Sequence, residues 1–250
     1  MKSLNILLAI LLSSSTLFAQ KESIPIGAVT YIQKIDLQAE AHKNGPATLL
    51  FNNSRSIYIN NSAPKRDSSF STEEYVAYNI TGDKEGFPIY KVHAERQLFC
   101  KIPCRQSRNH CIVRDTFGAI PWVLHPEHKR FGQYDCRRAT GIFRGREYEA
   151  WYTLEIPIPS GPYKLGGLPG LILEARSLDN VVEFAFGGLV ISNMITGDIK
   201  FPEGKDMGVT QAAYQKDLEA FKERVLKDQK AQGYEVTITI METIELNMNN

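Results

Sequence analysis

The sequence predicts a mainly β protein, in which a curved antiparallel sheet or half-open barrel carries one long helix packed on it. Three observations support this class. Short segments rich in β-branched and aromatic residues recur along most of the chain, turn-forming or charged stretches separate them, and a single segment has the period of a helix. At 43% apolar and 10% aromatic residues, the chain also has enough material for a large core.

The predicted strands begin after the N-terminal region and continue almost to the end of the chain. Residues 27–37 and 47–59 are expected to form an early hairpin around the sequence HKNGP. The polar stretch 60–74 has no apolar period and is expected to be a loop. The further predicted strands are residues 87–99, 111–117, 134–143, 148–158, 171–175, 181–191 and 234–246. The stretches RQSRNH and HPEHKRFGQ are expected to separate strands.

One segment, residues 209–231, has the period of a helix. Tyr214, Leu218, Phe221 and Val225 recur at spacings of four, three and four, and Lys and Glu cover the opposite face. We expect this narrow apolar stripe to pack against the sheet. The alternative is that it recruits a partner or a membrane surface.

The first 19 residues are organised like a secretory signal peptide. Lys2 supplies the positive end, an apolar run follows, and Ala19 stands at the cleavage point. The run is short for a bilayer span, and no later segment is apolar enough for one. We therefore expect residues 20–250 to form a single exported β-rich domain, located in the periplasm, at the outer membrane or outside the cell.

The charge balance narrows the class of partner. The formal net charge is +1, so a strongly basic nucleic-acid binder is not indicated. No sequence pattern calls for a cofactor, and none is expected. The partners that fit are an apolar ligand or an envelope protein.

Four cysteines follow the signal peptide: Cys100, Cys104, Cys111 and Cys136. An even number in an exported chain favours two disulfides, although the sequence leaves all three pairings open. We favour Cys104–Cys111 as a local loop and Cys100–Cys136 as a link between neighbouring strands, because these residues are close in sequence.

A metal site is the alternative use of this region. His110 adjoins a cysteine, and His125 and His128 are only three residues apart. The CxxxC spacing is not typical of zinc sites, however, and Pro126 argues against a helix that presents both histidines. Structural disulfides are therefore the favoured interpretation.

The stretch GPYKLGGLPGLILEA, residues 161–175, raises the question of a ligand loop or a structural turn. Pro169 and Gly170 fit the two central positions of a type II turn, which requires positive φ at the glycine. Gly167, with its neighbour Gly166, allows another backbone to approach closely. The spacing is not that of a phosphate-binding GxGxxG loop, so we expect a structural turn.

Several segments in this part of the chain resemble the GLPGLI protein family. They are YDCRRA (134–139), FRGREYEAWYT (143–153), EIPIPSGP (155–162) and GGLPGLILEA (166–175). Upstream, residues 49–58 and 120–134 are also similar to that family. The resemblance implies an exported protein of a type found mainly in Bacteroidetes, and it implies no established activity. It does not account for Cys100, Cys104 or Cys111.

Two classes of function remain open. The first is a non-enzymatic carrier, binding protein or assembly factor whose curved sheet holds an apolar ligand or a polypeptide. Its candidate ligand-binding residues are basic, aromatic or apolar and lie within or next to the family-like block: Arg144, Arg146, Tyr148, Trp151, Tyr163 and Leu168. The arginines fit an anionic partner, although a charged, solvated strand edge explains them as well.

The second class is a periplasmic hydrolase or a metal-binding protein that uses the Cys/His cluster at 100–136. The chain contains no GxSxG, HExxH or thiol-protease signature, and we assign no catalytic residue. Glu155 and Glu174 flank the GLPGLI stretch, and solvated glutamates explain them better than a catalytic pair does.

Overall fold

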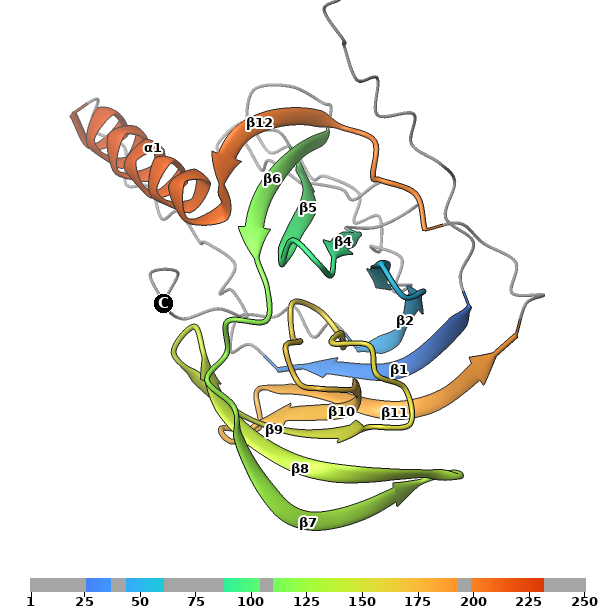
Figure 1. Cartoon of the computed structure of the whole chain (residues 1–250). Coiled ribbons are helices and arrows are strands. Elements are labelled where there is room, and N and C mark those ends of the chain that lie inside the picture. Colours follow the sequence, from blue (N-terminus) through green and yellow to red (C-terminus); the bar gives the residue numbers. More distant parts are fainter. Residues whose placement is uncertain (1–25, 37–43, 61–87, 104–109, 193–198, 232–250) are drawn as a thin grey trace, which may run out of the picture.

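The computed structural model describes residues 26–36, 44–60, 88–103, 110–192 and 199–231, except for the side chains of residues 222, 225 and 229. Within these residues, twelve strands form one sheet and a helix follows the last strand (Figure 1). The elements are β1 (Gly27–Ile35), β2 (Gly45–Phe51), β3 (Arg55–Asn60), β4 (Ile89–Val92), β5 (Gln97–Pro103), β6 (His110–Thr116), β7 (Val123–Phe131), β8 (Tyr134–Phe143), β9 (Arg146–Thr153), β10 (Leu171–Ser177), β11 (Val182–Ile191), β12 (Lys205–Thr210) and α1 (Gln211–Ala231).

The sheet is open and strongly curved, with β12 at one edge and β7 at the other (Figure 1). Its order is β12-β6-β5-β4-β3-β2-β1-β11-β10-β9-β8-β7. All neighbouring strands are antiparallel except β12 and β6, which are parallel. The prediction of a mainly β, predominantly antiparallel protein is therefore confirmed, in the form of an open sheet.

The inner face of the sheet carries the main core. In β1, Val29 and Tyr31 are fully buried, whereas the next residue along the strand, Ile32, is exposed. Successive side chains of a strand point to opposite faces of the sheet, which explains this alternation. The register places Leu49 of β2 opposite Val29, so the apolar face continues from strand to strand. Burial of this continuous face is the main driving force for the fold.

A smaller core covers the outer face of β3, β4 and β5. Ile57 and Tyr90 lie on this face and pack against Ile199 and Phe201, which precede β12. The Phe201 ring meets Tyr90 edge-on, with 5.3 Å between the ring centroids. The segment before β12 thus closes one half of the outer face.

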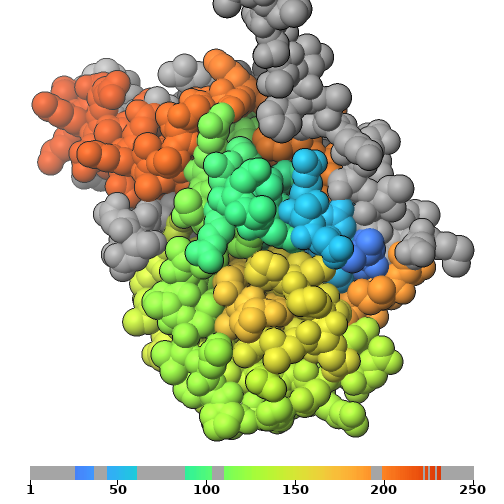
Figure 2. All heavy atoms as spheres, in the orientation of Figure 1, coloured from blue at the N-terminus to red at the C-terminus, as the bar shows by residue number. Residues whose placement is uncertain are grey.

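The connection between β9 and β10, residues 154–170, turns back into the curve of the sheet (Figure 1). Its apolar side chains Ile156, Ile158, Leu165 and Leu168 are buried in the main core. Figure 2 shows the same segment as yellow atoms set among the blue and green strands. We call residues 154–170 the plug, because they fill the inner face that the curved sheet would otherwise expose.

Two predicted strands are each divided in two. Residues 47–59 form β2 and β3, because the side-chain oxygen of Asn52 accepts hydrogen bonds from the backbone of Ser54 and Arg55 and closes a tight turn. Residues 87–99 form β4 and β5, with a turn at 93–96 in which Arg96 has a φ of 51°. Predicting one continuous strand in each segment was wrong.

The structure also contains two strands that the sequence did not predict. Residues 125–131 of the charged stretch HPEHKRFGQ, which was expected to separate strands, lie within β7. The strand β12 falls in a region without a strand pattern. Both are edge strands. In β7, Pro126 and an irregular register between Leu124 and His128 interrupt the pairing, and charged side chains cover the rest. Such features protect an open edge from pairing with another chain.

The helix α1 is confirmed, but its predicted packing is wrong in part. Tyr214 packs against the main core, whereas Phe221 is 39% exposed, and the side chain of Val225 lies outside the described residues. The helix meets the sheet at β12 and β6 and projects away from it (Figure 1). No helix within the described residues has the length and hydropathy needed to cross a membrane. The predicted signal peptide, residues 61–74 of the predicted loop and the predicted strand at 234–246 lie outside those residues, and Asn60 ends β3.

Candidate binding site

Buried polar groups of β3, β4 and the turn after β4 hold the plug. The Lys91 side chain is fully buried, and its Nζ donates to the carbonyl oxygens of Gly161 at 2.7 Å and Leu165 at 3.0 Å. The hydroxyl oxygens of Ser56 and Ser160 are 2.8 Å apart, and Nε2 of His93 lies 3.1 Å from that of Ser56. Strands of the sheet thus satisfy polar groups that the plug buries.

These groups have the composition of a catalytic site but not its accessibility. Burial lowers the pKa of Lys91 to about 7, although the neighbouring Cys100 opposes this, and burial lowers the pKa of His93 to about 4. Ser56 and Ser160 are fully buried as well. A nucleophile must be reached by its substrate, so the arrangement of this Ser–His pair is that of a structural anchor.

Asp115 organises a second anchor at the opening of the curved sheet. Its carboxylate accepts from Arg144 at 2.5 Å and from Lys164 of the plug at 3.1 Å, and all three side chains are buried. Asp115 lies in β6, the second strand from one edge, and Arg144 lies in the turn between β8 and β9, next to the other edge. The ion cluster therefore ties the two ends of the open sheet to the plug.

The glycines of the GLPGLI stretch allow close backbone approach. Gly167 has a φ of 89°, and a Cβ added there would lie 2.5 Å from the Cα of Gly118. Gly170 does not have positive φ, so the predicted type II turn is wrong. A Cβ on Gly170 would lie only 2.0 Å from the carbonyl oxygen of Thr153. This contact, rather than a left-handed backbone, explains the glycine at 170, while Pro169 is exposed beside it.

The structure places most of the predicted ligand-binding residues inside the protein. Tyr148 and Leu168 are core side chains, and Tyr163 stacks on Phe184 with a ring separation of 6.4 Å. Arg146 is buried in an ion pair with Asp179, as Arg144 is with Asp115. The locations of these five residues favour structural roles.

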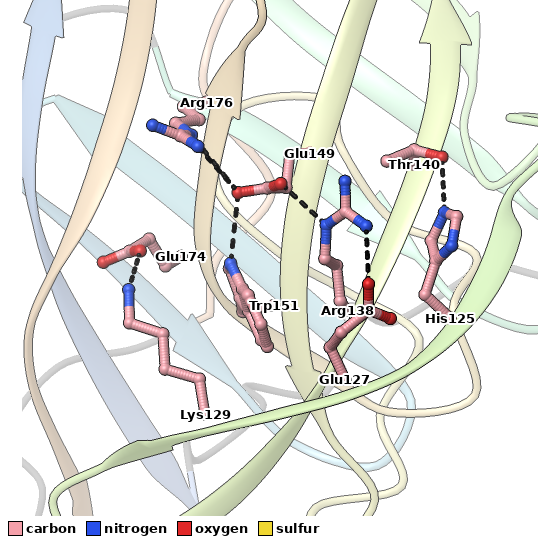
Figure 3. Close-up of polar contacts among 9 residues, drawn as sticks. All are labelled: His125, Glu127, Lys129, Arg138, Thr140, Glu149, Trp151, Glu174 and Arg176. Atoms are coloured by element: carbon pink, nitrogen blue, oxygen red, sulfur yellow. Dashed lines mark hydrogen bonds and ion pairs between the residues drawn. The ribbon is translucent and has the colours of Figure 1, made fainter.

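Two of the predicted ligand residues, Tyr163 and Trp151, are only partly buried. Of these, Trp151 lies on the outer face of β7–β10. The register sets Arg138 and Glu174 opposite Trp151, and sets Thr140 and Arg176 opposite Glu149, two residues along the same strand. Figure 3 shows these side chains together. We call this group the Trp151 face; its residues are His125, Glu127, Lys129, Arg138, Thr140, Glu149, Trp151, Glu174 and Arg176.

The charged side chains of the Trp151 face form alternating pairs. Glu149 accepts from Arg138 at 2.7 Å and from Arg176 at 3.1 Å. Burial alone would raise the pKa of Glu149, but the hydrogen bond from Arg138 and the charge of Arg176 outweigh burial and lower it. Lys129 donates to Glu174 at 2.7 Å, and Arg138 also reaches Glu127 at 3.1 Å (Figure 3).

The indole of Trp151 is fixed within this array. Its Nε1 lies 3.4 Å from Glu149, and the Lys129 ammonium lies 5.6 Å from its ring centroid. Part of the ring packs against the main core, and the rest is exposed. Sequence reasoning selected Trp151 but missed its charged neighbours. The alternation in REYEAWYT could have placed Glu149 on the same face of the strand.

The cysteine prediction is wrong for one pair. Cys100 and Cys136 form no disulfide, and both are buried. They lie on β5 and β8, which are separated by seven strands in the sheet, so they are not neighbours. Burial, together with nearby acidic groups, raises the pKa of Cys136 to about 12, which keeps it a thiol. The pairing of Cys104 with Cys111 stays a prediction, because Cys104 lies outside the described residues.

The three histidines of the metal alternative lie on two strands. His125 pairs with Thr140 at 2.8 Å and His128 with Asp135 at 2.8 Å, both across β7 and β8, while His110 begins β6. In the part of the chain that the structure describes, no group of three or more His, Cys, Asp or Glu side chains is placed to hold a metal ion.

Comparison with known proteins finds one matching family and solved structures with a similar fold. Residues 142–174 match a family described as "Protein of unknown function (Porph_ging)". This segment includes the six residues GLPGLI (167–172) and the whole plug; the GLPGLI family name itself stays a prediction. No curated protein is significantly similar to the chain.

Two solved structures of PNGF-II share the fold. The structure in space group P21 has a TM-score of 0.51 and 12% identity, and that in space group C2 has a TM-score of 0.52 and 11% identity. Each similarity covers 76% of this chain and 32% of the other, so the chain spans about a third of the length of those proteins. At this identity the likeness concerns the fold alone.

Proposed function

We propose that this protein is an exported, non-enzymatic binding protein of the cell envelope that binds its partner on the outer surface of the sheet. The observation that carries the proposal is the plug. A carrier for an apolar ligand needs an accessible apolar interior, and here residues 156–168 occupy the inner face with their own apolar side chains. The outer face of the sheet is then the surface that contacts the partner.

The anchoring of the plug supports a permanent structural role for it. Lys91 binds two of its carbonyl groups, Asp115 binds Lys164, and Trp122 donates to the carbonyl oxygen of Gly166 at 2.9 Å. Displacing the plug to admit a ligand would leave these buried polar groups without partners, each at a cost of about 1–3 kcal/mol. An apolar ligand would have to compensate for all of them at once.

Export of the protein is part of the proposal, and it rests on residues 1–19. When the full chain is produced in a bacterium with a periplasm, we expect the mature protein there to begin at Gln20. N-terminal sequencing tests this. A cytoplasmic protein that keeps Met1 would contradict it.

Two binding experiments test the proposed function. The mature protein should take up neither lipid nor the apolar dye N-phenyl-1-naphthylamine with saturation, because its interior is filled. Labelled mature protein should bind isolated cell envelopes saturably, and Trp151→Ala should weaken this binding. Saturable uptake of one lipid per protein, or no binding to envelopes, would overturn the proposal.

A further inference from the structure

The Trp151 face combines an aromatic ring with an electrically balanced set of charges. Lys129, Arg138 and Arg176 supply three cations, and Glu127, Glu149 and Glu174 supply three anions. Each cation of the face is ion-paired with at least one of its anions, so the face has little net field. An ionic ligand would gain little from such a surface, because attraction to one group is offset by repulsion from the next.

The charged side chains of the Trp151 face are held in place by ion pairs but remain partly exposed to solvent. The Arg138 side chain is 26% exposed and that of Arg176 is 54% exposed, although both bind Glu149. Glu174 and Lys129 are 21% and 45% exposed in their own pair. Each guanidinium has five N–H donors and each carboxylate can accept several hydrogen bonds. The face therefore offers donors and acceptors side by side, held in place by their mutual contacts.

The indole adds an apolar surface in the middle of this array. Its ring face carries negative charge density and attracts the slightly positive hydrogens of C–H groups. Charged residues lie on both sides of Trp151, at Arg138 on β8 and Glu174 on β10. A purely apolar surface, such as a lipid bilayer core, would have to desolvate these charges and is disfavoured.

We propose that the Trp151 face binds a neutral saccharide. A sugar hydroxyl both donates and accepts, so neighbouring hydroxyls can bind a carboxylate and a guanidinium of the face together. The C–H groups of a sugar ring can stack on the indole. Electrical neutrality, alternating donors and acceptors, and a central aromatic ring together match this class of ligand. The inference rests on the proposed function and adds the chemical class of the ligand.

The test uses the mature full chain on a panel of immobilised neutral oligosaccharides, followed by calorimetry with the strongest binder. We expect saturable binding to at least one of them, and an affinity that changes less than about twofold between low and moderate salt, since no net charge is neutralised. Trp151→Ala should lower the affinity about tenfold or more. Glu174→Gln removes an acceptor at a partly exposed position and should weaken binding several-fold while leaving the fold intact.

The matched control is Ile142→Ala. Ile142 is exposed on β8, two residues from Thr140 on the same side of the strand, but belongs to no part of the array. This variant should keep full affinity. Binding only to anionic glycans with strong salt dependence, unchanged binding by folded Trp151→Ala and Glu174→Gln, or no binding to the panel would each overturn the inference. If the protein still bound envelopes in the last case, the proposed function would stand without the saccharide.

Discussion

Gly170→Ala tests how the GLPGLI stretch acts. A Cβ at this position would lie 2.0 Å from the carbonyl oxygen of Thr153 and 2.8 Å from its carbon. Real Cβ atoms do not approach backbone so closely, so β10 or the end of β9 must shift. Such overpacking costs about 1–3 kcal/mol and sometimes more. Because both strands are buried here, we expect the upper end, about 3 kcal/mol.

The matched control is Gly132→Ala, in the turn between β7 and β8. Gly132 has a φ of 58°, but no atom lies within 4 Å of its added Cβ. The alanine then lowers the free energy of unfolding only because its backbone must adopt the left-handed conformation, at a cost of about 1 kcal/mol. For a protein of this size, Gly170→Ala should lower Tm by about 6–12 °C and Gly132→Ala by about 2–4 °C. Thermal unfolding followed by circular dichroism measures both. An equal or larger loss for Gly132→Ala would show that close approach is not the reason for the glycine at 170.

Other predictions concern buried ionisable groups. His93 has a pKa of about 4 when folded, against 6.5 for the ordinary side chain, so its burial destabilises the protein as pH falls from 6.5 to 4, by about 2–3 kcal/mol. Urea unfolding should show this slope, and His93→Gln should reduce it. The folded pKa of Lys91 is also lowered, so its contribution makes the free energy of unfolding rise between pH 7 and 10.5, and Lys91→Met should flatten that rise. Asp115→Ala leaves two buried cations without their carboxylate and should cost about 3–5 kcal/mol in the same assay; a loss below 1 kcal/mol would contradict the described cluster. Alkylation without reductant should label Cys100 and Cys136 only after denaturation, and labelling of neither would indicate that they are oxidised.

Local sequence patterns predicted the strands that are rich in apolar, β-branched and aromatic residues. β8, β10 and β11 were predicted nearly within their bounds, because their apolar, β-branched and aromatic content is typical of strands. β7 was missed because an edge strand needs little burial on either side, and its charges and Pro126 are typical of a loop. The turns that divide β2 from β3 and β4 from β5 depend on single residues such as Asn52, which a periodic pattern does not register.

The anchors of the plug could not be predicted from the sequence. Asp115 is separated from Arg144 by 29 positions and from Lys164 by 49, and no spacing rule connects them. Lys91 gave a weak signal, since it occupies an inward position between apolar neighbours of a short strand. The Trp151 face was half predictable: strand alternation relates Glu149 to Trp151, but the partners on β7, β8 and β10 require the register.

The family match covers residues that fill the core and residues that lie on the outer face, and these two groups have different roles. Residues 142–174 include the turn at Arg144, the strand β9 and the whole plug. An open sheet of twelve strands cannot bury its inner face without such a segment, so most of the matched residues are explained by folding alone. Within that block, Glu149, Trp151 and Glu174 contribute to the outer face, where they are not needed to fill the curve. Proteins that share this fold but bind different partners would retain the plug and differ at these outer positions. Exchanging the outer residues while retaining the plug should therefore change what the protein binds without changing its fold.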